Sequence, residues 1–400
     1  MEYLALSMAV ILLLGLFFSK LSKKINLPGF FGMIILGMVI GPYCLNLINA
    51  QLLQSSSDIM VIALVVIIIR AGFGINRKAI KESVFTVLKL GFIPSLIEAI
   101  IITILAKIIF NWPVIECFML GYILTAISPA IIVPHMLDML KDKLGTDKNI
   151  PQIILASCAL DDVLVVAIFS AILTIFSSPS GGNVYGLILD IPLSIIFGII
   201  AGLVIAVVVL LLFKELDLDL VEKTIIILAA ALLMKSISDI PSLLIPFSGL
   251  IGVIVISFFI IDKKKELGVP ISAMFDDIWI FVEIFVFVLV GAQVNLSSAI
   301  NYIPIGLLII IIGLLARSLG VYFSLWGSDL NNNEKFFCMG SFIPKASVQA
   351  AIGSMPLAAG VPSGHIILAI TVICILFTSP LGGVVMENLK KKFFENESVT

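Results

Sequence analysis

About thirteen apolar runs, each long enough to cross a bilayer, follow one another along this chain with short polar connections between them. A helix needs about 20 apolar residues to span a hydrocarbon core of about 30 Å. Hydrophobic residues make up 60% of the 400 residues and charged residues 12%, which is more apolar surface than one soluble core can bury. The sequence therefore predicts an all-α polytopic membrane protein. The predicted spans are 2–19, 27–48, 57–75, 84–110, 114–137, 149–177, 184–213, 222–238, 241–262, 274–295, 302–326, 335–357 and 363–388.

The composition excludes several other classes of protein. Lys and Arg number 24 against 26 Asp and Glu, and no basic patch with interleaved aromatic residues is present, so we expect no nucleic-acid partner. The five cysteines are scattered, without a CxxC motif or paired histidines. We therefore expect no cofactor and no enzymatic activity. An intramembrane aspartyl protease is disfavoured because its two aspartates must come from separate helices.

Basic residues are confined to alternate connections between the predicted spans. They follow the odd-numbered spans, at Lys20/Lys23/Lys24, Arg77/Lys78/Lys81, Lys141/Lys143/Lys148, Lys214/Lys223, Lys263/Lys264/Lys265, Lys335 and Lys390/Lys391/Lys392. The positive-inside rule then predicts an outside N-terminus and a cytoplasmic C-terminus. The first run, with its lysines after it, is interpreted as a span and not as a cleaved signal peptide. We expect a multi-pass protein of the cell (inner or plasma) membrane.

Ionisable residues occur deep inside several spans. Asp161 and Asp162 lie about twelve residues into their span, or roughly 18 Å, near the midplane. The same counting gives a similar depth to Glu98, Ser128, Arg317 and Lys345. Charged groups at this depth usually face the interior of the bundle, where they pair with one another or line a pathway. The set as a whole favours a functional site over isolated structural pairs.

Two spans are interrupted by proline. Pro129 and Pro134 break the predicted span 114–137, and Pro344 breaks 335–357. A proline in mid-span frees carbonyl groups and leaves half-helix ends at the midplane. Broken helices in corresponding positions are typical of an ion site between inverted repeats.

Spacing between landmarks indicates such a repeat. Glu98 precedes Pro129 by 31 residues and Arg317 precedes Pro344 by 27; Asp162 follows Pro129 by 33 and Ser379 follows Pro344 by 35. Predicted spans 4 to 6 and 11 to 13 thus form two copies, and an odd offset of seven spans gives them opposite orientations. Glu98 and Arg317 become counterparts that are expected to pair across the pseudo-two-fold axis.

Four motifs resemble a known family. They are IRAGFG at residues 69–74, TAISPAIIVP at 125–134, SCALDDVL at 157–164 and PKASVQAAIGS at 344–354. In these motifs the chain resembles the monovalent cation/proton antiporters of the double-aspartate type, in the branch that contains the animal sodium/lithium-proton exchangers.

The resemblance implies an elevator-type transporter with two crossing broken helices, usually a homodimer. The ion-binding core would comprise residues 84–177 and 302–388, moving against dimerisation helices within 1–48 and 184–295. In family members the second aspartate is the main ion carrier, a role carried over onto Asp162, with Asp161 assisting.

The chemistry of the aspartate pair agrees with exchange. Two adjacent carboxylates in a low dielectric cannot both stay ionised without a cation, so Na⁺ or Li⁺ and protons compete for the same oxygens. The expected ion and proton ligands are Asp162, Asp161, Thr125, Ser128 and Ser157. Glu98, Arg317 and Lys345 are expected to compensate charge.

The predicted activity is exchange of Na⁺ or Li⁺ for H⁺. The electrogenic members of the family carry a lysine at the place of Arg317. Since arginine does not release its proton in a protein, this residue favours electroneutral exchange. A K⁺/proton antiporter and a sodium-coupled symporter of the same fold remain open alternatives.

Overall fold

The computed structural model describes residues 3–25, 27–74, 84–177, 184–238, 240 and 247–395, and every regular element in these residues is a helix. Arg77, Lys78 and Lys81, used above for the topology, lie outside the described residues. The elements are α1 (Leu4–Lys24), α2 (Gly29–Ile40), α3 (Ala50–Gln54), α4 (Ser56–Gly74), α6 (Val84–Phe110), α7 (Val114–Thr125), α8 (Pro129–Lys141), α9 (Ile150–Ser177), α10 (Val184–Glu215), α11 (Leu220–Ser238), α12 (Gly249–Lys263), α13 (Lys265–Ala292), α14 (Leu296–Ser324), α15 (Asn332–Ser341), α16 (Ser347–Ile352), α17 (Met355–Ala358), α18 (Gly364–Lys390) and the π-helix Lys391–Glu395.

The helices correspond to the predicted spans and make this a multi-pass membrane protein. Within the described residues, seven helices are long and apolar enough to cross a membrane individually: α1, α4, α6, α9, α10, α14 and α18. The remaining predicted spans contain shorter, more polar or broken helices. None of these described helices is by itself both long enough and apolar enough to cross a membrane. α13 differs most from its prediction, 274–295, because the helix begins at Lys265, directly after α12.

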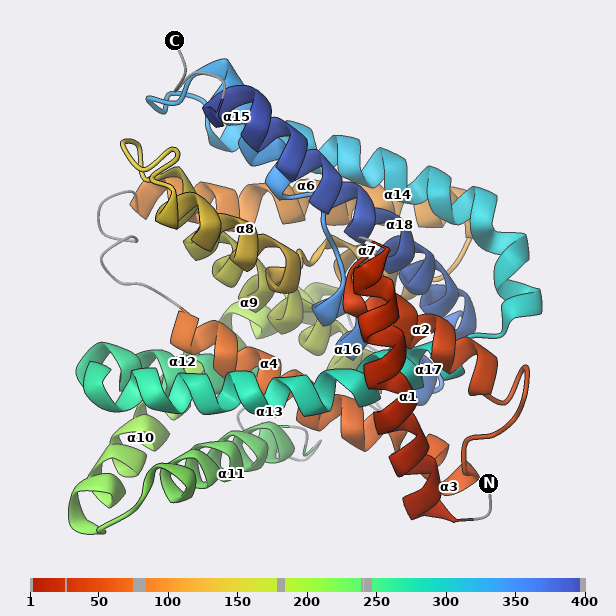
Figure 1. Ribbon diagram of the computed structural model, residues 1–400, viewed down its shortest axis with the longest axis horizontal. Coiled ribbons are helices and arrows are strands. Elements are labelled where there is room, and N and C mark those ends of the chain that lie inside the picture. Colours follow the sequence, from red (N-terminus) through yellow and green to blue (C-terminus); the bar gives the residue numbers. More distant parts are fainter. Residues whose placement is uncertain are drawn as a thin grey trace.

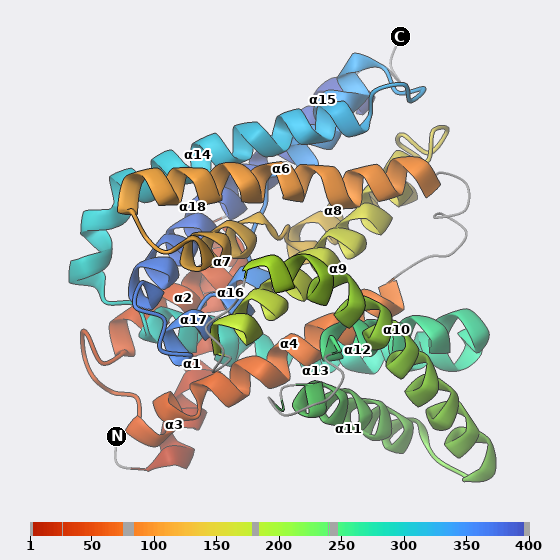
Figure 2. The same cartoon turned by 180° about the vertical axis from the view of Figure 1, so that it is seen from behind.

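Helices α6 and α14 lie side by side across the upper part of the molecule in both views (Figures 1 and 2). Glycines on α14 permit the close approach: a Cβ at Gly320 would lie 2.7 Å from Pro94 Cα, and one at Gly313 would lie 2.9 Å from Ile102 Cδ1. Because α6 opens the first predicted repeat and α14 opens the second, this packing brings the two repeats together.

Both predicted breaks are present, and the two broken helices meet at them. Three residues separate α7 from α8, and five separate α15 from α16. The backbone N–H of Ser128 in the first gap donates to the carbonyl of Pro344 in the second, at 2.9 Å. Pro129 fits at the first position of α8, where no intrahelical partner for an N–H exists. Pro134, in contrast, does not end the helix, and α8 runs through it to Lys141.

Two matching contacts tie each broken helix to the other repeat. Glu116, in the first turn of α7, accepts a hydrogen bond from the backbone N–H of Ser363, which caps α18. Glu334, in the first turn of α15, accepts from Lys148, which lies just before α9. Since α7 corresponds to α15 and α9 to α18, the two glutamates make equivalent contacts. They support the inverted repeat that the spacing predicts.

The other long helices form a second group. In both views α10 to α13 lie below α6, α14 and α18, and α4 runs obliquely at the level of α12 and α13 (Figures 1 and 2). Small residues bring this group close together: a Cβ at Gly37 of α2 would lie 2.0 Å from the Val288 carbonyl of α13, and one at Gly202 of α10 would lie 2.6 Å from the Gly252 carbonyl of α12. These backbones therefore pack at distances that only glycine allows.

Candidate functional site

The ionisable residues that the sequence places at the midplane come together beside the crossing of the broken helices. Arg317 of α14 is 1% exposed and bridges two carboxylates. One guanidinium nitrogen lies 2.8 Å from Glu98 Oε2 on α6, and the other lies 2.9 Å from Asp161 Oδ1 on α9. The expected pairing of Glu98 with Arg317 is thus present. Asp161, however, accepts a hydrogen bond from the other terminal nitrogen of the same guanidinium.

Lys345 completes this network from the gap between α15 and α16. Its ammonium lies 2.6 Å from Glu98 Oε1, so both oxygens of that carboxylate hold a cation. The same ammonium donates to the carbonyl of Leu124 at 2.6 Å and to that of Thr125 at 3.3 Å. These carbonyls end α7, where the helix dipole is negative, so Lys345 neutralises a half-helix end. The half-helix that it neutralises belongs to the other repeat.

Asp162 differs from every other carboxylate of the network. It is fully buried, and neither oxygen has a hydrogen-bond partner among the described residues. Asp161 retains one unpartnered oxygen, Oδ2. A buried carboxylate without a partner is costly, since the desolvation penalty is several kcal/mol per ion. Asp162 is therefore the position at which a proton or a cation would be most strongly stabilised.

The three predicted hydroxyl ligands have different surroundings. Ser128 is fully buried and its Oγ has no partner among the described residues. Thr125 donates its hydroxyl to the Tyr122 carbonyl at 3.0 Å, and Ser157 donates to the Val87 carbonyl at 3.3 Å. The Thr125 carbonyl, at the end of α7, accepts from Arg317 at 2.6 Å and from Lys345. Ser128 is thus the hydroxyl with the most unused hydrogen-bonding capacity.

Gln349, on α16, is a buried polar residue that the sequence reasoning did not select. Its amide nitrogen donates to the Ala126 carbonyl in the gap between α7 and α8, and its Oε1 is unpartnered among the described residues. It lies within the motif PKASVQAAIGS, on a helix that is apolar apart from this residue and Ser347, so its residue type was the available signal.

A cavity of about 580 Å³ opens beside the crossing, between α8, α18 and the segment that joins α1 to α2. Its lining residues include Pro28, Ile131, His135, Ser379 and Glu387. The hydroxyl of Ser379 donates to the Lys345 carbonyl at 2.6 Å, so the cavity wall touches the second break directly. The cavity therefore reaches the second break at Ser379.

Comparisons with known proteins agree on one family. The sequence pattern described as "Sodium/hydrogen exchanger, transmembrane" matches residues 8–392. Human sodium/hydrogen exchanger 9B1 is 27% identical over 347 residues, covering 84% of this chain and 66% of that protein. Human sodium/hydrogen exchanger 9B2 is 29% identical over 391 residues, covering 94% and 71%. The chain thus spans about two thirds of the length of these relatives.

The fold has a solved counterpart as well. The structure of the sodium proton antiporter MjNhaP1 from Methanocaldococcus jannaschii at pH 8 matches with a TM-score of 0.80 at 24% identity, covering 98% of each chain. At this identity the likeness establishes the shared fold, which is the antiporter fold predicted from the sequence.

Proposed function

Because this chain belongs to the sodium/hydrogen exchanger family, we propose that it is a secondary active antiporter that exchanges Na⁺ or Li⁺ for H⁺. The observation that carries the proposal is Asp162, a fully buried carboxylate without a partner among the described residues, beside a network in which the other acids are paired. Its oxygens can hold a hard cation or a proton, and not both at once.

The charges around Asp162 support a single exchanged charge. The cluster contains three buried carboxylates and two buried basic groups. The carboxylates are Glu98, Asp161 and Asp162; the basic groups are the permanently charged Arg317 and Lys345, which is paired with Glu98. With all five groups ionised, the cluster carries one excess negative charge. One monovalent cation or one proton restores neutrality, so the site returns across the membrane with the same total charge in either loaded form. We infer electroneutral exchange from this balance.

The ligands of the cation follow from the same contacts. Asp162 provides the charged oxygen, and the unpartnered oxygens of Ser128 and Gln349 are the neutral donors favoured by the structure. Asp161 assists through its free Oδ2, while its Oδ1 stays on Arg317. Thr125 and Ser157 contribute through hydroxyl oxygens whose hydrogens are already donated elsewhere. Oxygen donors of this kind suit Na⁺ and Li⁺.

Alternating access requires one part of the protein to move against another. We assign the moving core to residues 84–177 and 302–388, because the Glu98, Asp161, Arg317 and Lys345 contacts bind its two halves together. The scaffold comprises 1–48 and 184–295, and we expect it to form the interface of a homodimer. The cavity beside Pro28 and Ser379 lies between the two parts and offers the ion route on one side.

The orientation follows from the lysines. Helices α4, α8, α10 and α12 all end on the left side of Figure 1, and Lys141, Lys214 and Lys263 stand at three of these ends. The positive-inside rule assigns this side to the cytoplasm. The N-terminus is then outside, and the protein resides in the inner or plasma membrane.

A vesicle assay tests the proposal. The purified protein is reconstituted in proteoliposomes with a preset pH gradient and a trapped pH-sensitive dye, and Na⁺, Li⁺ or K⁺ is added. We expect Na⁺ and Li⁺ to collapse the gradient. Collapse by K⁺ alone identifies a K⁺/proton antiporter. If no cation collapses the gradient, antiport is rejected and the sodium-coupled symporter becomes the reading to test.

A further inference from the structure

A second cavity, also of about 580 Å³, lies far along the chain from the ion site, where α10 ends and α12 turns into α13. Four lysines line it, Lys214, Lys263, Lys264 and Lys265, against a single acid, Glu266. Its remaining walls are apolar, from Leu210, Phe213 and Leu267. A pocket that combines an excess of positive charge with apolar walls suits an amphipathic anion.

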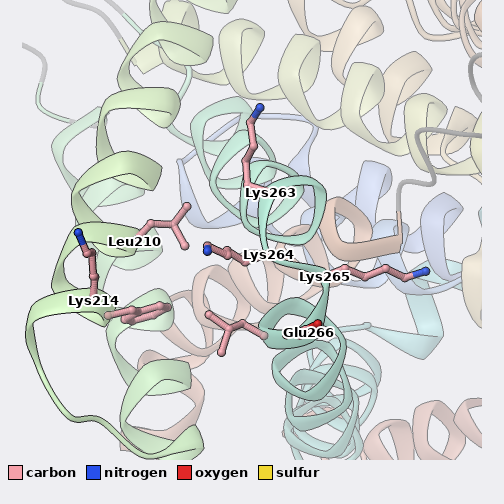
Figure 3. Close-up of a pocket in the computed structure, with 8 residues that line it drawn as sticks. Leu210, Lys214, Lys263, Lys264, Lys265 and Glu266 are labelled. Atoms are coloured by element: carbon pink, nitrogen blue, oxygen red, sulfur yellow. The ribbon is translucent and has the colours of Figure 1, made fainter.

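The four lysines of this basic pocket point in different directions. Figure 3 shows Lys264 extending from the α12–α13 connection toward α10, whereas the Lys214 side chain runs along α10 and Lys263 and Lys265 point away. Lys263 lies 5.8 Å from the ring of Phe259. No salt bridge to another described residue neutralises Lys214 or Lys264. Both are exposed, so an anion from outside the protein can reach them.

An apolar stripe leads away from the basic pocket along α10. Leu203, Val207, Leu210 and Lys214 follow one another at helical spacing, so they lie on one face of the helix. Leu203 and Val207 are 38% and 44% exposed. The adjacent face of α10, with Gly198 and Gly202, is the one packed on α12. The stripe is therefore an uncovered strip of apolar surface that ends at a lysine.

We propose that the basic pocket binds the phosphate headgroup of an anionic phospholipid, whose acyl chain lies along the Leu203–Val207 stripe. The pocket lies at the ends of α10 and α12, where a spanning helix reaches the headgroup layer. Lysines at that level attract anionic lipids, and their stems pack on apolar surface while the ammonium groups meet the phosphate. A free phosphate ion uses only the lysines, whereas a phospholipid uses the lysines and the stripe together. The lipid is therefore the occupant that fits the whole surface.

The test measures lipid binding by the purified full-length protein. Native mass spectrometry counts bound phosphatidylglycerol, and thermal unfolding in detergent is followed with phosphatidylglycerol, phosphatidylcholine or inorganic phosphate. The test variant is K214Q/K264Q. The matched control, K20Q/K24Q, removes two exposed lysines at the end of α1, outside the pocket. K214R/K264R keeps the charge and should bind as the unchanged protein does.

We expect phosphatidylglycerol to bind and to raise the unfolding temperature, and affinity to fall about fivefold per lysine, about 25-fold in K214Q/K264Q. The affinity of the control variant K20Q/K24Q for phosphatidylglycerol should fall much less. The proposal is overturned if the unchanged protein and K214Q/K264Q retain phosphatidylglycerol equally. It is also overturned if phosphatidylcholine raises the unfolding temperature as much as phosphatidylglycerol does. If inorganic phosphate raises the unfolding temperature as much as phosphatidylglycerol does, the occupant is not a lipid. None of these readouts involves transport, so their failure leaves the proposed antiport standing.

Discussion

Replacing each of the two neighbouring aspartates by asparagine should give opposite outcomes. Asp162→Asn removes the carboxylate of the buried cluster that has no partner among the described residues. It leaves two acids, Glu98 and Asp161, balanced by Arg317 and Lys345. Asp161→Asn removes the negative charge of a partner 2.9 Å from Arg317 and leaves a neutral amide there. The first change should abolish exchange without harming the fold, and the second should weaken the fold while leaving measurable exchange.

The magnitudes follow from the contacts. Removing one partner of a buried ion pair costs about 3–5 kcal/mol, and Asp161→Asn should lie near the lower end because Arg317 keeps Glu98. An unpartnered buried amide costs about 1–3 kcal/mol, but residue 162 is already unpartnered in the unchanged protein, so Asp162→Asn should change stability by less than about 1 kcal/mol. Na⁺ at about 100 times its Kd should stabilise the unchanged protein by about 2.7 kcal/mol and Asp162→Asn not at all.

The assay combines two measurements on the same preparations. Thermal unfolding with and without Na⁺ gives stability and ion binding, and collapse of a pH gradient in proteoliposomes gives exchange. The reasoning is refuted if Asp162→Asn still exchanges at the normal rate. It is equally refuted if Asp162→Asn unfolds as readily as Asp161→Asn, because Asp162 would then hold a structural partner.

Four further predictions concern the site and the contacts between the repeats. Exchange by the unchanged protein should not respond to an imposed membrane potential; strong voltage dependence in clamped proteoliposomes contradicts the charge balance. Arg317→Lys should lower the free energy of unfolding by about 1–3 kcal/mol, because one ammonium cannot reproduce the guanidinium fork that binds Glu98 and Asp161. Ser128→Ala and Gln349→Leu should each raise the KM for Na⁺ about tenfold with little change in maximal rate, since each removes one neutral oxygen; an unchanged KM in an ion-titrated exchange assay removes that residue from the ligand set. Lys148→Met should lower the unfolding temperature equally at pH 6 and pH 9. The hydrogen bond to Glu334 raises the pKa of Lys148 above 10.5. The contact is therefore fully present below that value and is lost only as pH rises through the raised pKa. A loss that differs between the two pH values, measured by thermal unfolding, contradicts this assignment.

Much of the architecture could be predicted because its signals are local. Apolar runs of sufficient length predict spanning helices whatever surrounds them, and Pro129 and Pro344 interrupt a helix wherever they occur. The prediction for Pro134 was wrong, because a proline in α8 removes one hydrogen bond without ending the helix. The start of α13 was also misplaced, since its polar first turns lie outside the apolar run that hydropathy detects.

The repeat extended these local signals to one long-range contact. Matching distances from Glu98 and Arg317 to the two breaks predicted that these residues pair, and the side chains lie 2.8 Å apart although 219 positions separate them. The contacts of Lys345 could not be predicted in this way. It neutralises the end of α7 and the second oxygen of Glu98, and both contacts depend on how the two broken helices cross.

The sequence by itself determined that two adjacent carboxylates lie deep in a membrane helix beside two broken spans. It could not determine from their chemistry which aspartate is free, because neighbouring residues on a helix differ only by a rotation of about 100°. The tertiary structure decided this by packing α14 against α6 so that Arg317 meets Asp161 and leaves Asp162 without a partner among the described residues. The orientation of one helix face toward another is a property of the packed bundle, and no local pattern in the chain encodes it.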